Sequence, residues 1–458
     1  MTDPVHGALE NAAARALDYV ASSGTRRVFP DPAALDALIG FDEELPAVGS
    51  PIDETLAMLD ELGSPATVAS TGPDYFGFVT GGTLPAALGA SWLTSAWDQN
   101  AALPVMSPVA AKLHEVVRSW LVEALDLPRA AGVAFVTGAT VANAACIAAA
   151  RDALLARAGW DSAEDGLFGA PEVTVVVGAQ AHSTVRKSLG FVGLGRRRVL
   201  VVPADDQGRM RTELLPHDVE GPVLVCAQAG EVNTGAFDPF DELEDWTAAR
   251  DGWLHVDGAF GLWARADPTR AHLTAGLDRA DSWATDGHKW LNVTYDCGMA
   301  FVRSSADLAR SFHAAAGYLP PDDRFEAMHH TPQSSQRARQ VEVWAALRSL
   351  GREGIARLVA DSSAAAALIA DALRSQGVTV LNDVVLNQVL VRFGGPEETN
   401  AVIAAIQADG RTWCGPTVWA GEPAMRISVS SWRTTLDDAR RAADVILECH
   451  AAVRSAAH

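Results

Sequence analysis

Hydrophobic positions in the first part of the chain recur at the spacing of a helix. The apolar residues of "ALENAAARALDYV" fall three or four positions apart, at Leu9, Ala13, Ala16, Leu17 and Val20, which predicts an amphipathic helix. The prolines of "VFPDPAALDALIG" then interrupt and restart the pattern. Residues 1–70 therefore predict a helical arm with too little core to stand alone, which we expect to pack on the main domain or on a partner subunit.

From residue 71 to about 330 the pattern changes to short apolar runs separated by helical or turn-rich segments. The seven runs are "GVAFVTG", "EVTVVVG", "RVLVV", "PVLVCAQAG", "GWLHVDGA", "DSWATDG" and "CGMAFVR". They lack strict polar alternation, which is typical of strands that are buried on both faces. The segment predicts an α/β domain with a seven-stranded, mostly parallel sheet that carries helices on both faces.

The pattern changes again in residues 331–458. A long helical stretch interrupted at Gly351 precedes the strands "VTVL" and "VVLNQVLVRF", the helix "TNAVIAAIQADG", the strand "AMRISVSSW" and a last helix. We expect a smaller α+β domain here, so the boundaries are predicted near residues 70 and 330.

Composition and charge exclude several classes of protein. The 458 residues include 48% hydrophobic and 20% charged residues, as in ordinary globular proteins. A formal net charge of −21 repels nucleic acid and anionic membranes. The five cysteines are far apart and form no CxxC pair, which argues against a disulfide framework or a metal site. With no basic leader and no apolar run of membrane-spanning length, we expect a cytoplasmic protein.

Lysine is rare in this chain. Of the 36 lysine and arginine residues only Lys112, Lys187 and Lys289 are lysine. Lys289 lies in "TDGHKWLNVTYDCG", just after a predicted strand. An amine forms an imine with a carbonyl compound, whereas a guanidinium does not deprotonate and cannot. Lys289 is therefore either a surface charge or the anchor of a carbonyl cofactor.

Three further polar or small-residue sites follow predicted strands. Gly138, Ala139 and Thr140 open a helix, as in a phosphate site, although an ordinary turn with Thr140 as the N-cap gives the same pattern. Asp257 ends another strand, where a carboxylate binds a ligand or caps a turn. His182 follows a third predicted strand, although a lone histidine is commonly a structural residue.

Together the four sites match the needs of pyridoxal phosphate. The phosphate needs a helix N-terminus, the pyridine nitrogen an anion, the ring a stacking partner and the aldehyde an amine. The chain resembles the group II pyridoxal-phosphate-dependent amino-acid decarboxylases, which have the fold-type I architecture of the aspartate aminotransferase superfamily. The resemblance lies in "DYFGFVTGG", "SPVAAKLHEVVRSWLVEALDLP", "VTGATVANAACIAAARDAL", "AHSTVRKS", "NTGAFDPF", "WLHVDGAFG", "DGHKWLNVTYDCG", "VEVWAALRSLGREGI" and "RISVSSWRTT".

The resemblance implies a role for each matching residue. Lys289 would bind the cofactor aldehyde, Asp257 the pyridine nitrogen, His182 one face of the ring and Ala259 the other. Gly138, Ala139 and Thr140, with His288 nearby, would hold the phosphate. Arg426 would meet a substrate carboxylate, or is a structural arginine of a small-domain strand.

Two stretches depart from the family pattern. Glu231 and Val232 stand where many members have two threonines, so a hydroxyl is lost unless Asn233 or Thr234 replaces it, and Glu231 either faces substrate or is solvated. The second stretch is the 317–335 loop.

The resemblance to the aromatic decarboxylases implies a loop tyrosine that reprotonates the substrate carbon. The candidate donors here are Tyr318, His329 and His330. The Pro-Pro-Asp-Asp and Ser-Ser content of the loop favours a mobile lid.

The expected function is decarboxylation of an L-amino acid to an amine and CO₂. Phe78, with Phe76 and Trp97, favours an apolar or aromatic substrate side chain over glutamate, although all three also suit a core. The alternatives are transamination, aldehyde-forming oxidative decarboxylation or carbon–sulfur cleavage on the same cofactor, and a catalytically silent cofactor-binding protein. The resemblance also implies a homodimer with its active site at the interface.

Overall fold

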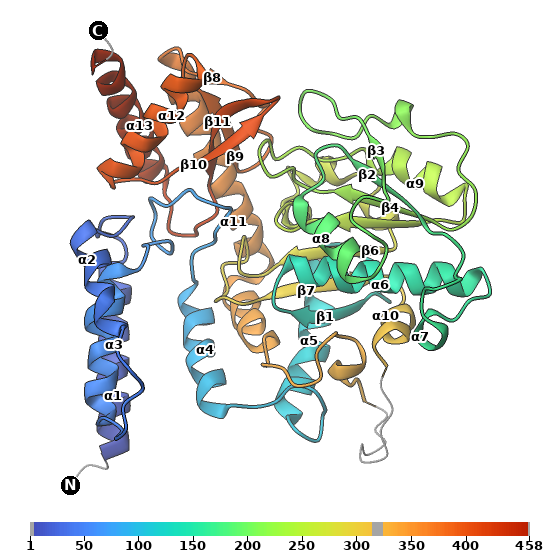
Figure 1. Cartoon of the computed structure of the whole chain (residues 1–458), viewed down its shortest axis with the longest axis horizontal. Helices are drawn as coiled ribbons and strands as arrows, with labels where there is room; N and C mark the ends of the chain where they lie inside the picture. Colours follow the sequence, from blue (N-terminus) through green and yellow to red (C-terminus); the bar gives the residue numbers. More distant parts are fainter. Residues whose placement is uncertain (1–3, 314–323, 457–458) are drawn as a thin grey trace.

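A computed structural model describes residues 4–313 and 324–456 (Figure 1). The helices are α1 (Pro4–Ser22), α2 (Pro32–Asp36), α3 (Ile52–Ala66), α4 (Pro85–Trp97), α5 (Pro108–Ala124), α6 (Ala139–Arg157), α7 (Ser162–Asp165), α8 (Ser183–Phe191), α9 (Phe240–Ala248), α10 (Ser305–Phe312), α11 (Gln340–Ser375), α12 (Pro396–Asp409) and α13 (Leu436–Ala456). Six short 3₁₀ helices, beginning with η1 (Ala37–Phe41), complete the helical elements of these ranges.

The larger sheet has seven strands in the order β1-β7-β6-β5-β4-β2-β3. They are β1 (Gly132–Val136), β2 (Thr174–Gly178), β3 (Leu200–Val202), β4 (Val223–Gln228), β5 (Trp253–Asp257), β6 (Ser282–Asp286) and β7 (Gly298–Val302). Only β7 runs antiparallel to its neighbours β1 and β6. The predicted mostly parallel, seven-stranded sheet is confirmed.

Successive residues of the strands point to two different cores. In β1, Val133 and Phe135 pack with residues of α5, α9 and α11, whereas Ala134 and Val136 pack with α6, α8 and α10. Five of the seven strands are buried at every position. Cover on both faces explains why the strand sequences show apolar runs without polar alternation.

Helix α6 is long and apolar enough to cross a membrane, which the sequence analysis did not expect of any segment. It is 78% buried within the protein over its most apolar window. The helix is rich in alanine because it lies directly on the sheet, so its apolar character is that of a core helix.

The second sheet is antiparallel, in the order β10-β11-β9-β8. Its strands are β8 (Thr379–Val380), β9 (Gln388–Arg392), β10 (Gly415–Trp419) and β11 (Glu422–Ser428), and α12 and α13 pack on it with the second half of α11. Strand β10 was missed by the sequence analysis because "GPTVW" carries a proline, which only an edge position tolerates. Gly351 interrupts α11 with φ +62°, where the sequence predicted a break.

The N-terminal residues form the predicted helical arm. Figure 1 shows α1 and α3 side by side at the edge of the molecule, away from the seven-stranded sheet. All five cysteines, elsewhere in the chain, are unpaired and buried. The domain boundaries near residues 70 and 330 stay predictions.

Candidate active site

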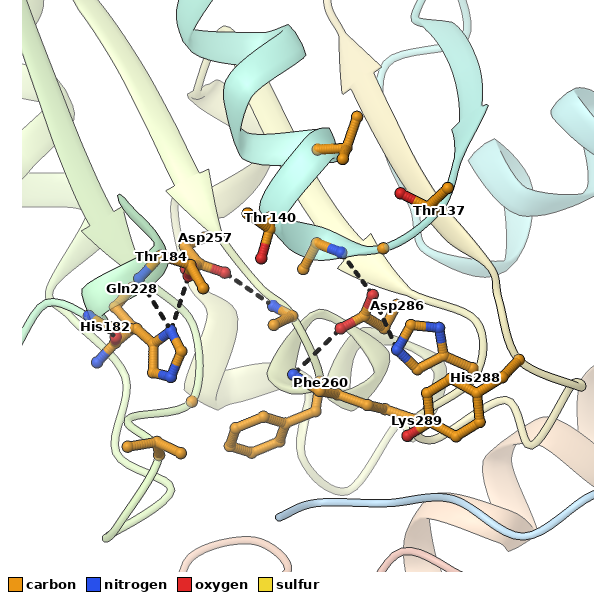
Figure 2. Close-up of a pocket in the computed structure, with 17 residues that line it drawn as sticks. Thr137, Thr140, His182, Thr184, Gln228, Asp257, Phe260, Asp286, His288 and Lys289 are labelled. Atoms are coloured by element: carbon orange, nitrogen blue, oxygen red, sulfur yellow. Dashed lines mark hydrogen bonds and ion pairs between the residues drawn. The ribbon is translucent and has the colours of Figure 1, made fainter. Parts of the chain in front are cut away.

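A cavity of about 390 Å³ lies at the carboxyl ends of strands β1, β2, β4, β5 and β6. Figure 2 shows the side chains around it. The lining residues are Thr137, Gly138, Ala139, Thr140, Val141, His182, Thr184, Gln228, Gly230, Val232, Asp257, Ala259, Phe260, Asp286, His288, Lys289 and Tyr295. Open α/β sheets bind ligands at the carboxyl ends of their strands. All eight residues that the sequence assigned to a cofactor line this cavity.

The N-terminus of α6 supplies an anion site on one wall of the cavity. Gly138 is the N-cap, so Thr140 lies in the first turn and is not the N-cap that the alternative interpretation required. The amide of Ala139 donates to Asp286 Oδ1 at 2.6 Å. A Cβ on residue 138 would come within 3.2 Å of His288 Cε1, so only glycine leaves this turn open to a ligand.

Asp257 ends β5 at the base of the cavity. Its side chain is 3% exposed, and Oδ1 accepts a hydrogen bond from the amide of Ala259 at 3.2 Å. Burial raises the pKa of this carboxyl, while the charges of His182 and Lys289 act in the opposite direction. A buried carboxylate without a salt-bridge partner among the described residues suits a cationic ligand group.

His182 caps the N-terminus of α8. Its Nδ1 lies 2.7 Å from Thr184 Oγ1, and its backbone amide donates to Gln228 Oε1 at 3.1 Å. Burial lowers the pKa of His182, partly offset by the charge of Asp257. The imidazole is therefore neutral near pH 7, which suits a ring that stacks on a ligand.

Lys289 reaches the cavity from the turn after β6. Its Nζ lies 3.1 Å from Asp286 Oδ2, and His288 Nε2 lies 3.4 Å from Asp286 Oδ1. The amide of Cys297 donates to His288 Nδ1 at 3.1 Å, which leaves the imidazole proton on Nε2. Tyr295 stacks on the His288 ring with a centroid distance of 4.2 Å. Burial lowers the pKa of His288.

Glu231 neither faces the cavity nor is solvated, so both expectations for it are wrong. It is 1% exposed and accepts hydrogen bonds from the amides of Asn233 and Thr234, each at 2.7 Å. It closes a turn that presents Val232 to the cavity. Arg426 donates to the Val232 carbonyl at 3.3 Å, which places the guanidinium behind this turn.

The remaining substrate candidates lie outside the cavity lining. Phe78 is 64% exposed and packs on Trp413, whereas Phe76 belongs to the core of the smaller lobe and Trp97 is 42% exposed. The His330 ring packs on Phe325 and hydrogen-bonds the Glu326 carbonyl.

Of the other two loop candidates, only His329 belongs to the described residues, and it does not line the cavity. Tyr318 lies outside the described residues. His329 contacts Glu326 through Nε2 at 2.9 Å.

The lining residues that were not singled out from the sequence include four with polar side chains, Thr184, Gln228, Asp286 and Tyr295. Asp286 and Gln228 end strands as Asp257 does, so the same positional argument would have found them. Thr184 and Tyr295 lie within the quoted motifs. Their side chains reach the cavity because of the local turns, which the motif letters alone do not show.

The lining residues fit pyridoxal phosphate. An anion site, a buried carboxylate, a neutral imidazole and an amine face one cavity, which matches the four chemical groups of that cofactor. The described residues contain no cluster of three or more histidine, cysteine, aspartate or glutamate side chains that could hold a metal ion.

Comparison with known proteins gives the same cofactor. Residues 37–393 match the model of the pyridoxal-dependent decarboxylase conserved domain. The chain belongs to the pyridoxal-dependent decarboxylase family. It is a pyridoxal-phosphate-dependent amino-acid decarboxylase, as the sequence analysis predicted.

Individual relatives differ in their substrates. The chain is 30% identical to L-2,4-diaminobutyrate decarboxylase of Rhizobium meliloti (strain 1021), over 90% of this chain and 85% of that protein. It is 28% identical to histidine decarboxylase of Drosophila melanogaster, over 92% of this chain but 52% of that protein. The fold matches that of Oryza sativa TDC with PLP and tryptamine at a TM-score of 0.90, with 23% identity and 98% of both chains covered.

Proposed function

We propose that this decarboxylase works through Lys289, Asp257 and His182 in the cavity at the strand ends. The observation that carries the proposal is that the Lys289 amine, the α6 N-terminus and the buried Asp257 carboxylate line the same cavity. Lys289 would bind the cofactor aldehyde, and Asp257 would pair with the pyridine nitrogen. Gly138, Ala139, Thr140 and His288 would hold the phosphate, and His182 and Ala259 would enclose the ring.

When bound, pyridoxal phosphate supplies a ring that accepts the electrons left by departing CO₂. Asp257 would favour the protonated pyridine nitrogen because it places a buried negative charge in the cavity. The neutral His182 imidazole packs without adding a positive charge. Val232 and Phe260 give the cavity apolar walls, which would reduce the access of water to the bound substrate.

The proton donor to the substrate carbon is proposed to lie on the 317–335 loop. Of its candidates, His329 and His330 are described, and His330 Nδ1 lies 3.0 Å from the Glu326 carbonyl oxygen. Burial lowers the pKa of His330, so its ring is neutral near pH 7. This favours a donor other than an imidazolium at position 330, with Tyr318 and His329 as the remaining candidates.

We propose an L-amino acid with an apolar or aromatic side chain as the substrate. Among the described lining residues the cationic groups are Lys289 and the histidines 182 and 288, and burial lowers the pKa of both histidines. The lining thus contains no spare cation for a side-chain carboxylate, and Arg426, whose charge acts on His182, donates to the Val232 carbonyl from outside the lining. Val232, Phe260 and Tyr295 supply apolar contact area instead.

A screen of the common L-amino acids for amine and CO₂ release tests this proposal. We expect the highest kcat/KM with aromatic or large aliphatic substrates. Preferential turnover of glutamate or aspartate would overturn the substrate class. Release of a keto acid, or of an aldehyde with ammonia, would favour one of the alternative reactions on the same cofactor.

We also propose a homodimer in the cytoplasm. The arm and the segment after it expose a run of large apolar side chains, which are Leu9, Leu17, Ile39, Leu45, Val48, Leu59, Trp92, Leu93, Val105 and Met106. A cleft of about 520 Å³ between α1, α3 and α4 adjoins them. Monomers rarely leave such a surface uncovered.

The unpaired cysteines favour a reducing compartment, which fractionation of the source cells would check.

The partner would also complete the active site. The backbone of Gly81 lies directly against the Lys289 carbonyl. Phe78, three residues before Gly81 in the chain, is exposed, so a partner subunit that covered it would lie close to Lys289. Light scattering of wild type and of Leu59→Asp tests the dimer, with Phe168→Asp, at an exposed apolar residue away from the arm, as the control. We expect only Leu59→Asp to dissociate and to lose activity. A wild-type monomer with full turnover would contradict the proposal.

A further inference from the structure

Four buried polar side chains form a line behind Asp257, on the face of the sheet that α6 covers. Trp253 Nε1 lies 2.9 Å from Ser282 Oγ, and Ser282 Oγ lies 2.9 Å from His255 Nδ1. His255 Nε2 lies 2.9 Å from Asn143 Oδ1. All four residues are at most 2% exposed, and none of them lines the cavity.

Asn143 is the link between this line and the active site. It lies in the second turn of α6, and its amide lowers the pKa of Asp257 by hydrogen bonding to the carboxylate. By hydrogen-bond geometry, the buried Asn143 Nδ2 has no partner among the described residues. Asp257 lies two residues after His255 on β5, so both side chains point to the face of the sheet that α6 covers, where this NH₂ group is buried.

The two ends of the line determine the direction of its hydrogen bonds. The indole of Trp253 only donates, and an ionised carboxylate only accepts. Burial lowers the pKa of His255 to about 3, so the ring is neutral and carries one proton. If Asn143 turns its NH₂ to Asp257, its oxygen faces His255 Nε2, which must then hold that proton. His255 Nδ1 accepts from the Ser282 hydroxyl, which accepts from the Trp253 indole.

The reverse direction would bring two oxygens together. With the proton on His255 Nδ1, Asn143 would donate to Nε2 and would turn its oxygen toward the Asp257 carboxylate. That arrangement is repulsive in a buried site. The observed geometry therefore supports one orientation of the Asn143 amide.

We propose that His255 and Asn143 are positioning residues that hold a hydrogen-bond donor on Asp257, and so keep its carboxylate ionised and directed at the pyridine nitrogen. The inference rests on the proposed role of Asp257. It adds that residues on the α6 face of the sheet, which touch neither cofactor nor substrate, determine how strongly Asp257 binds the pyridine nitrogen. Their loss should weaken the contact at the ring nitrogen alone.

The test compares pyridoxal phosphate with its 1-deaza analogue, in which carbon replaces the pyridine nitrogen. Dissociation constants of the full-length chain are measured for both by fluorescence titration. We expect wild type to prefer the natural cofactor by about tenfold or more, and the preference to fall at least about threefold in Asn143→Leu and His255→Leu. His255→Gln retains a donor for Asn143 and should keep most of the preference.

The readings separate the possible explanations. A purely structural role would weaken the binding of both compounds equally and leave their ratio unchanged, which would overturn the inference. An unchanged ratio in Asn143→Leu alone would also overturn it, even if the His255 variants fail to fold. A wild type without any preference would instead contradict the role of Asp257 itself.

Discussion

Asp286 stands between the Lys289 amine and the first turn of α6. One carboxylate oxygen accepts from the Ala139 amide at 2.6 Å, and the other lies 3.1 Å from Lys289 Nζ. This places a negative charge at the site proposed for the cofactor phosphate. At the scale of single residues, Asp286 should therefore oppose cofactor binding, although its hydrogen bond orders the first turn of α6.

Asp286→Asn should tighten the binding of pyridoxal phosphate. Asparagine keeps an oxygen for the Ala139 amide but removes one charge beside a phosphate dianion. A like-charge interaction of about 1 kcal/mol corresponds to about a fivefold lower dissociation constant. Fluorescence titration measures it, with the exposed Asp126→Asn as the control. Unchanged or weaker binding would show that Asp286 does not face the phosphate.

His114 offers a second test, of stability against pH. Its ring stacks on Phe325 at 3.9 Å, and neither nitrogen has a hydrogen-bond partner within the described residues. Burial lowers the pKa of His114 to about 3. Because the folded pKa lies below the unfolded value, the stability that depends on the neutral ring is complete above about pH 6.5 and is lost as the pH falls toward 3.

His114→Phe should remove this pH dependence. At pH 5 the neutral histidine costs the folded state about 2 kcal/mol relative to an ordinary histidine, and phenylalanine avoids that cost. Urea unfolding at pH 7 and pH 5 should show a smaller loss of stability in His114→Phe than in wild type. The exposed His217→Phe is the control. If His114→Phe and wild type lost the same unfolding free energy between pH 7 and pH 5, the His114 ring would not be buried in its neutral form.

At the scale of elements, the site depends on how closely strands and turns approach each other. Gly298 begins β7, and a Cβ there would lie 2.4 Å from the Gly138 backbone. The glycine of the "TYDCG" motif is thus required by the turn that opens α6. This contact joins the Lys289 segment to the anion site.

Gly298→Ala should therefore displace the phosphate turn without removing any functional side chain. We expect the affinity for pyridoxal phosphate to fall by about tenfold or more, which corresponds to at least about 1.4 kcal/mol. Gly395→Ala is the matched control, because a Cβ at that position meets nothing within 4 Å. Full cofactor affinity in Gly298→Ala would contradict the close approach.

The elements that the sequence predicted well are those with strong local signals. Strands buried on both faces have continuous apolar runs, and β5 and β6 end on the cavity residues Asp257 and Asp286. The edge strand β10 has no such signal, and the burial of Glu231 depends on a turn closed by Asn233 and Thr234. The His255–Asn143 contact joins residues 112 positions apart, so it requires the register of α6 on β5.

At the scale of the whole molecule, two lobes meet along α11. Its first half packs beneath the large sheet and its second half in the core of the smaller lobe. Charge and composition argue against nucleic acid and anionic membranes as partners, which stays a prediction, and they could not show which face of the molecule stays apolar. The exposed surface of the arm emerges only when the helices are placed in space (Figure 1).

The central claim is that Lys289 anchors pyridoxal phosphate in this decarboxylase. The purified, cofactor-loaded chain is reduced with borohydride, digested and analysed by mass spectrometry, which makes the cofactor link permanent and locates it. With only three lysines in the chain, the assignment is unambiguous. We expect one phosphopyridoxyl group, on the peptide that contains Lys289. A stoichiometric adduct on Lys112 or Lys187, or none at all, would contradict the account.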